Sequence, residues 1–120
     1  GGIGQPAGGG MSDLVGIEDV QRLGLRVGVV VSAKDHPNAD RLLVVDVDLG
    51  DGSPRQLVAG IRGSYQAADL VGKCVVVVTN LKPALIRGIE SQGMILVASD
   101  DRGIVLLAPE RALAPGSLVK

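Results

Sequence analysis

The sequence has few aromatic residues. Phe and Trp are absent from its 120 residues, and Tyr65 is its one aromatic side chain. Domains that bind unstructured single-stranded nucleic acid stack successive bases on several aromatic rings, so this composition argues against that class of protein. Val, Leu and Ile make up most of the apolar content, and such an aliphatic, β-branched composition favours strands.

Residues for metal binding are also scarce. The chain has one cysteine, Cys74, and one histidine, His36, so it holds no cysteine–histidine set at metal-ligand spacing and no internal disulfide. Cys74 directly precedes four valines, which predicts a buried, unreactive thiol. We expect no structural metal and no cofactor.

Catalytic motifs are missing as well. We find no phosphate-binding loop, paired-glycine fingerprint or nucleophile-elbow serine, and His36 has no serine or cysteine partner in a recognisable motif. Asp46 and Asp48 fall on one face of a predicted strand and could share a proton or hold a cation. Acids that alternate with Val and Leu are more typical of the solvated face of a half-buried strand. The sequence therefore predicts a protein that is not an enzyme.

The chain lacks a segment for crossing a membrane. No apolar run approaches the roughly 20 residues that span a bilayer, and no signal-peptide pattern occurs. Residues 1–10 contain six glycines, Pro6 and no charge, and Met11 follows them like an initiator methionine. We interpret residues 1–10 as a cloning remnant or flexible linker. Residues 11–120 are then one domain, which we expect to be soluble and cytoplasmic.

The order of the predicted elements indicates the fold. Hydrophobic periodicity and turn residues predict a short helix at 13–23 and strands at 26–33, 42–49 and 56–61. A second helix at 64–71 precedes strands at 73–79 and 93–98, and 103–107 with 117–119 adds short pairings. Three strands, a helix and two more strands match the five-stranded OB barrel, whose helix lies between strands three and four. We predict an all-β OB-fold with a short N-terminal helix and a C-terminal extension.

Residues 80–94 are the most informative segment, because they place amide, cationic and hydroxyl groups between two apolar runs. Pro83 argues against a central strand, so we expect a shaped loop that presents Asn80, Lys82, Arg87 and Ser91. Such groups suit phosphate and ribose oxygens. The structural alternative is a packed connection in which Asn80 and Ser91 satisfy backbone groups and Met94 fills a core gap.

The net charge argues against binding to nucleic acid, whereas the positions of the charged residues along the chain permit it. Twelve basic and thirteen acidic residues give a net charge of −1, whereas phosphate neutralisation usually requires a basic excess. Lys82 and Arg87, however, share a segment whose one acid is Glu90. Arg41 follows the turn formed by residues 36–40 and could point at phosphate, although a lone surface arginine more often faces solvent; Lys34 is a weaker candidate. A local positive surface therefore remains open.

Residues 36–43, 70–73 and 80–94 together closely resemble one family. It is the tRNA-binding domain that is appended to bacterial methionyl-tRNA synthetase, and that also occurs as free-standing dimeric tRNA-binding proteins and in endothelial monocyte-activating polypeptide. The resemblance spans roughly residues 17–120. It implies an OB barrel that forms a homodimer and binds folded tRNA without catalysis, by shape and backbone, free-standing or in association with methionyl-tRNA synthetase.

The resemblance also implies which residues contact RNA. The positions of Arg41, Ser91 and Met94 are linked to tRNA binding in the family, and Asn80 and Lys82 line the same face. With the candidates from charge alone, the predicted RNA-binding residues are Lys34, Arg41, Asn80, Lys82, Arg87, Ser91 and Met94.

A protein-interaction module is the alternative function. It would be a peptide-holding chaperone or a domain that docks on a synthetase, and the near-neutral charge favours it somewhat. Secretion chaperones of related sequence share the fold and the dimer but lack Asn-Leu-Lys-Pro followed by Ser-x-Gly-Met, so this sequence resembles the tRNA binders more. Apolar runs at 104–108 and 113–118 exceed what a five-stranded barrel needs, which supports a dimer contact.

Overall fold

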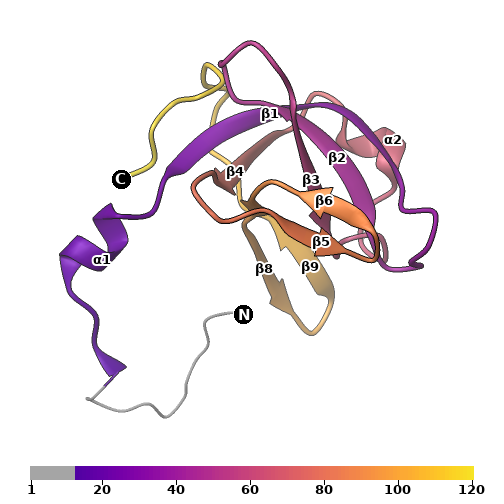
Figure 1. Ribbon diagram of the computed structural model, residues 1–120, viewed down its shortest axis with the longest axis horizontal. Coiled ribbons are helices and arrows are strands. Elements are labelled where there is room, and N and C mark those ends of the chain that lie inside the picture. Colours follow the sequence, from indigo (N-terminus) through magenta and orange to yellow (C-terminus); the bar gives the residue numbers. More distant parts are fainter. Residues whose placement is uncertain (1–12) are drawn as a thin grey trace.

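The computed structural model describes residues 13–120, so the cloning remnant or flexible linker predicted at 1–10 and the start of the predicted domain at 11–12 lie outside the described residues. The chain forms a small barrel from which a short helix projects (Figure 1). The helices in the described part are α1 (Ile17–Gln21) and α2 (Ala67–Leu70), and neither is long and apolar enough to cross a membrane. The strands are β1 (Leu25–Asp35), β2 (Leu43–Asp48), β3 (Arg55–Ala59), β4 (Cys74–Val78), β5 (Ala84–Ile86), β6 (Ile89–Ser91), β7 (Met94–Ile95), β8 (Val97–Asp100) and β9 (Gly103–Leu106).

Strand β1 is the centre of the barrel. Five strands form one antiparallel sheet in the order β3-β2-β1-β4-β7, and β1 pairs first with β4 and then with β2. Between Val30 and Ser32 its register against β2 shifts, and the additional residue, Val31, is exposed. Such a bulge bends a strand and increases its twist. The bend lets one strand serve two neighbours and curls the sheet.

The barrel closes where β3 meets the segment that joins β6 to β7. The Gln92 amide donates to the Gln56 carbonyl over 2.9 Å, and β7 pairs with β4 on its other side. Helix α2 follows β3 and precedes β4, packs on β1, and buries Leu70 in the core. The predicted five-stranded OB barrel, with its helix between strands three and four, is confirmed.

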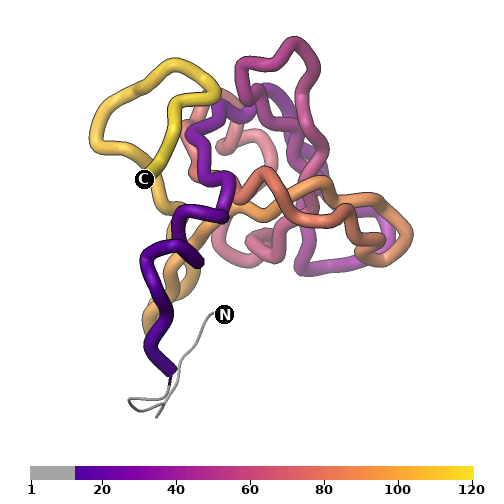
Figure 2. The backbone as a smooth tube through the Cα atoms, turned by 60° about the vertical axis from the view of Figure 1, so that its left-hand side comes forward, coloured from indigo at the N-terminus to yellow at the C-terminus, as the bar shows by residue number. Residues whose placement is uncertain are grey.

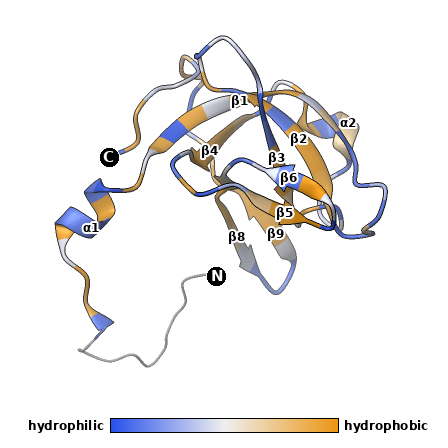
Figure 3. Cartoon of the chain, in the orientation of Figure 1, coloured by the Kyte–Doolittle hydropathy of each residue, from blue (hydrophilic) through white to orange (hydrophobic). Residues whose placement is uncertain are grey.

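Aliphatic side chains alone form the buried core. Figure 3 shows apolar residues along the barrel strands. Val45, Val47 and Leu49 are buried, while Asp46 and Asp48 between them remain partly exposed, which agrees with the predicted alternation. The buried cluster consists of Val30, Leu43, Val45, Val47, Leu49, Leu57, Ala59, Ile61, Leu70, Val75, Val77 and Ile95. In contrast to the prediction, Cys74 is only partly buried, because it starts β4 at the barrel's end.

Element boundaries differ from the predictions in the two helices and in the strand predicted at 93–98, and by one or two residues at the other barrel strands. Helix α1 begins at Ile17, because Gly16 is its N-cap and donates its amide to the Asp19 carboxylate over 3.3 Å. The helix predicted at 64–71 is confined to α2, after a turn in which two successive amides donate to the Ile61 carbonyl. The strand predicted at 93–98 divides at Leu96 into β7, in the barrel, and β8, which pairs with β9 outside it.

Gly28 provides a test of the closed barrel. A Cβ at this position would clash with Val47 and lie 3.0 Å from Leu49 Cδ2, both within the packed core. Gly28→Ala should therefore lower the free energy of unfolding by about 1–3 kcal/mol, as overpacking does, measured by urea denaturation. Gly63→Ala is the matched control, because a Cβ there meets no atom within 4 Å. Equal stability of Gly28→Ala and the wild type would show that the barrel has room at this point.

Candidate nucleic-acid interface

A hairpin, β5–β6, lies within residues 80–94, where the sequence predicted a loop. Arg87 and Gly88 form its tip, and both have left-handed backbone, with φ of 53° and 91°. A two-residue hairpin turn favours this conformation, and glycine at its second position suits it. Pro83 precedes β5 and does not interrupt the ladder. The predicted loop is therefore wrong for this part, and the Arg-Gly pair between two short strand-like segments is the signal that would have revealed it.

His36 joins this hairpin to the turn at residues 36–40. Its side chain is only 2% exposed. Nδ1 accepts the amide hydrogen of Asn38 over 3.0 Å, so the ring proton lies on Nε2, which donates to the Ile86 carbonyl over 3.1 Å. Two segments about 50 residues apart are thus held as one unit, and Figure 2 shows them side by side. Sequence reasoning found the turn but not this role of His36.

Two arginines lie on the unit that His36 holds together. Arg41 is exposed directly after the turn, and Arg87 is exposed at the hairpin tip, where its Nη2 donates to the Asn38 carbonyl over 3.2 Å. The neighbouring acid Asp35 is paired with Arg62 at 3.0 Å, which offsets its charge. Arg41 and Arg87 therefore both adjoin the turn at residues 36–40, beside the exposed acid Asp40, and we call the two arginines the loop cluster. Lys34 is exposed near the end of β1, directly before Asp35.

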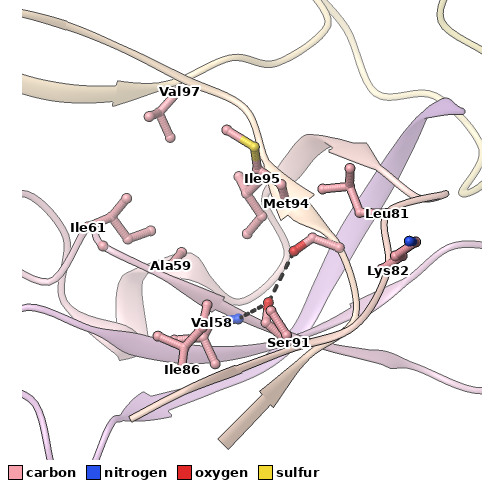
Figure 4. Close-up of a pocket in the computed structure, with 13 residues that line it drawn as sticks. Val58, Ala59, Ile61, Leu81, Lys82, Ile86, Ser91, Met94, Ile95 and Val97 are labelled. Atoms are coloured by element: carbon pink, nitrogen blue, oxygen red, sulfur yellow. Dashed lines mark hydrogen bonds between the residues drawn. The ribbon is translucent and has the colours of Figure 1, made fainter. Parts of the chain in front are cut away.

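An apolar groove of about 360 Å³ lies between the hairpin, β3 and β7. Figure 4 shows Leu81, Ile86, Met94 and Val97 around it, with Lys82 among the lining residues. Met94 is 48% exposed, so the expectation that it fills a core gap is wrong, because it lines an open groove. The structure brings Lys82 and Met94 together here, at some remove from the loop cluster.

Ser91 is bonded within the barrel and also lines the groove. Its side chain is 3% exposed. Its hydroxyl accepts the amide hydrogen of Val58 over 3.0 Å and donates to the Gly93 carbonyl over 3.0 Å. These bonds close the barrel between β3 and β7, as the structural alternative for this residue predicted. These bonds give Ser91 a structural role, and its assignment to RNA binding stays a prediction.

Asn80 is likewise used within the protein. Its Oδ1 accepts the Gly24 amide hydrogen over 2.7 Å, and its Nδ2 donates to the Arg22 carbonyl over 2.7 Å. The residue is exposed, but its amide ties the end of β4 to the segment between α1 and β1. This is the structural alternative again, so the candidates on the free surface are Lys34, Arg41, Lys82, Arg87 and Met94.

These features define a class of protein: a small OB barrel that presents cations from a loop, a hairpin and the wall of an apolar groove. Residues 25–118 match the family described as "Putative tRNA binding domain". The chain belongs to this tRNA-binding domain family, as the resemblance of its motifs implied.

Individual relatives agree with this assignment. The chain is 47% identical over 112 residues to a methionine–tRNA ligase of Thermococcus onnurineus, covering 93% of this chain and 15% of that ligase. Among solved structures, a MetRS related protein from Pyrococcus horikoshii has a TM-score of 0.82 and 29% identity, covering 90% of this chain and 99% of that one. Chaperone CsaA from Bacillus anthracis has a TM-score of 0.80 and 29% identity, and the match covers 89% of this chain and 99% of the chaperone chain.

The position of Ser91 leads to a prediction that separates folding from binding. Ser91→Ala removes the acceptor for the buried Val58 amide, so the free energy of unfolding should fall by about 1–3 kcal/mol. tRNA affinity of the folded variant should remain that of the wild type. Urea denaturation and filter binding measure the two quantities, and Ser99→Ala, on exposed β8, is the control. Weaker tRNA binding at unchanged stability would contradict this placement of Ser91.

Proposed function

We propose that the chain is a non-catalytic module that binds folded tRNA through backbone and shape, with the loop cluster and Lys82 as its main contacts. The observation that carries this proposal is the pair of hydrogen bonds by which His36 holds the turn at residues 36–40 against the β5–β6 hairpin. These bonds present Arg41 and Arg87 on one preorganised surface despite the net charge of −1. Arginine forks match phosphate oxygens in pairs, so positioned guanidinium groups suit an RNA backbone.

The state of the one aromatic residue supports folded RNA as the target. Tyr65 is partly buried against the core, and its hydroxyl accepts the Leu106 amide hydrogen over 3.0 Å. It is therefore committed to holding β9, and bases of a single strand have no aromatic platform here. Folded tRNA offers phosphates and 2′-hydroxyls in fixed positions instead.

A role beside a synthetase fits the relatives. The chain spans 15% of the length of the ligase that it matches, so the aminoacylation activity of such an enzyme would reside elsewhere. We propose that the module, attached or in trans, holds tRNA near a methionyl-tRNA synthetase and thereby raises the effective tRNA concentration.

We further propose a homodimer, because the barrel does not cover the apolar side chains of residues 14–23, in and around α1. Figure 2 shows α1 extending away from the barrel, and exposure ranges from 44% for Val20 to 77% for Leu14. The C-terminal segment continues this surface, since the Val119 amide donates to the Leu25 carbonyl over 3.0 Å and Leu118 is exposed beside it. A second copy would bury both segments.

Peptide binding is the second candidate function. The apolar groove favours it, because Leu81 and Met94 are large, exposed and adjacent there, and one relative of known structure is a chaperone. Salt separates the two candidates. Affinity that rests on phosphate contacts falls steeply with salt concentration, whereas apolar peptide binding hardly changes.

Titration with total tRNA at several salt concentrations tests the tRNA proposal. Lys82→Ala, Arg41→Ala and Arg87→Ala should each weaken binding and reduce the slope of log affinity against log salt by about one, the effect of one lost phosphate contact. Arg102→Ala, in the exposed turn between β8 and β9, is the charge-matched control and should bind like the wild type. The proposal fails if unstructured RNA binds better than tRNA, or if the three variants bind like the control.

Light scattering tests the dimer. Wild-type protein at micromolar concentration should give twice the monomer mass, and Val20→Glu should give the monomer mass, because it would bury an unpaired charge in the contact. Gln21→Glu adds the same charge next to it on the same helix and should stay dimeric. A monomeric wild type would exclude the dimer.

A further inference from the structure

A polar pocket of about 390 Å³ lies at one end of the barrel, apart from the loop cluster. Its lining includes Arg26 from β1, Arg55 from β3, Asp51 from the β2–β3 turn and Thr79 directly after β4. Sequence reasoning gave no role to either arginine. Two guanidinium groups and one carboxylate leave the lining with a net positive charge.

Both guanidinium groups are anchored by backbone carbonyls. Arg26 Nη1 donates to the Gly116 carbonyl over 2.8 Å, and Arg55 Nη1 donates to the Thr79 carbonyl over 2.6 Å. A guanidinium has five N–H donors, so each retains donors beyond this bond. Anchoring reduces the side-chain entropy that a ligand would otherwise cost, which preorganises the pair.

Asp51 offsets this charge only loosely. Its Oδ2 lies 3.8 Å from Arg55 Nη2, beyond hydrogen-bonding distance, and its side chain is 53% exposed. An exposed pair of this kind contributes little stability. A bound anion with better geometry can therefore compete with Asp51 for Arg55.

We propose that this pocket binds a phosphate of the RNA backbone, as a second contact region for the tRNA that the module holds. The inference rests on the proposed tRNA-binding function. Phosphate oxygens match the fork of each arginine, and the pocket is polar where the groove is apolar.

The pocket and the groove are close along the chain. Thr79, whose carbonyl anchors Arg55, is three residues before Lys82, so their Cα atoms are at most about 11 Å apart along the chain. One RNA strand that contacts Lys82 therefore reaches the pocket within a few nucleotides. The loop cluster, by contrast, lies at the other ends of β1 and β2 from the pocket.

The test compares loss and gain of charge in the full chain. Arg26→Gln and Arg55→Gln should each reduce the salt slope of tRNA binding by about one, with roughly tenfold weaker affinity at moderate salt. Asp51→Asn should strengthen tRNA binding severalfold, because it removes the competing carboxylate. If Asp51 and Arg55 only stabilised the fold, Asp51→Asn would not increase the affinity for tRNA. Arg111→Gln is the control: Arg111 also donates to a backbone carbonyl, but lies beside Cys74 at the opposite end of β4.

Stability and mass must accompany these titrations, because Arg55 also braces the end of β4. Urea denaturation and light scattering should show each variant folded and in the wild-type oligomeric state, and if Arg55→Gln unfolds, Arg26→Gln and Asp51→Asn carry the test. The inference is overturned if Arg26→Gln binds tRNA with wild-type slope and Asp51→Asn brings no gain, while Lys82→Ala still weakens binding. No salt-dependent binding of tRNA by the wild type would refute the proposed function itself.

Discussion

The double pairing of β1 is the constraint on which the rest of the structure depends. A core without aromatic rings has only aliphatic side chains to exclude water, and such side chains must interlock on all sides. The bulge after Val30 allows this, because the bent strand closes the barrel around the core. The same strand positions the segments that contact its two ends. The turn with His36 follows the last residue of β1, and the Asn80 bonds secure its beginning.

Net charge is a poor guide to this molecule because the charges are unevenly used. Asp35 is bound by Arg62, Asp46 accepts a hydrogen bond from Ser32, and Asp48 accepts one from the Gly50 amide. These acids serve local structure, whereas several cations stand on exposed loops. Local charge therefore depends on which side chains lie together, as Arg41 and Arg87 do beside the exposed Asp40, more than on the balance near zero.

The sequence predicted the barrel well because its strands alternate strongly and its helix falls at the expected place. It did not predict the β5–β6 hairpin, since strands of three residues carry little periodicity and Arg87 adopts a conformation that is uncommon for a residue with a side chain. The sequence does not show which backbone groups Asn80 and Ser91 bind within the protein, because their partners Gly24 and Val58 lie 56 and 33 residues away. Hydrogen bonds over such separations leave no local pattern. Arg26 and Arg55 gave no signal for the same reason.

The Asn80 amide also connects two surfaces: the apolar surface around α1, which we propose as the dimer contact, and the groove, which we propose as a ligand contact. It binds the backbone on either side of Leu23, next to the apolar helix, and stands two residues before Lys82 in the groove wall. A displacement of the segment after the helix should therefore be transmitted to the start of the groove. By thermodynamic reciprocity, a ligand that prefers one position of the groove must in turn favour the corresponding position of this segment by the same free energy. If the chain dimerises through this helix as proposed, self-association and ligand affinity should therefore be coupled.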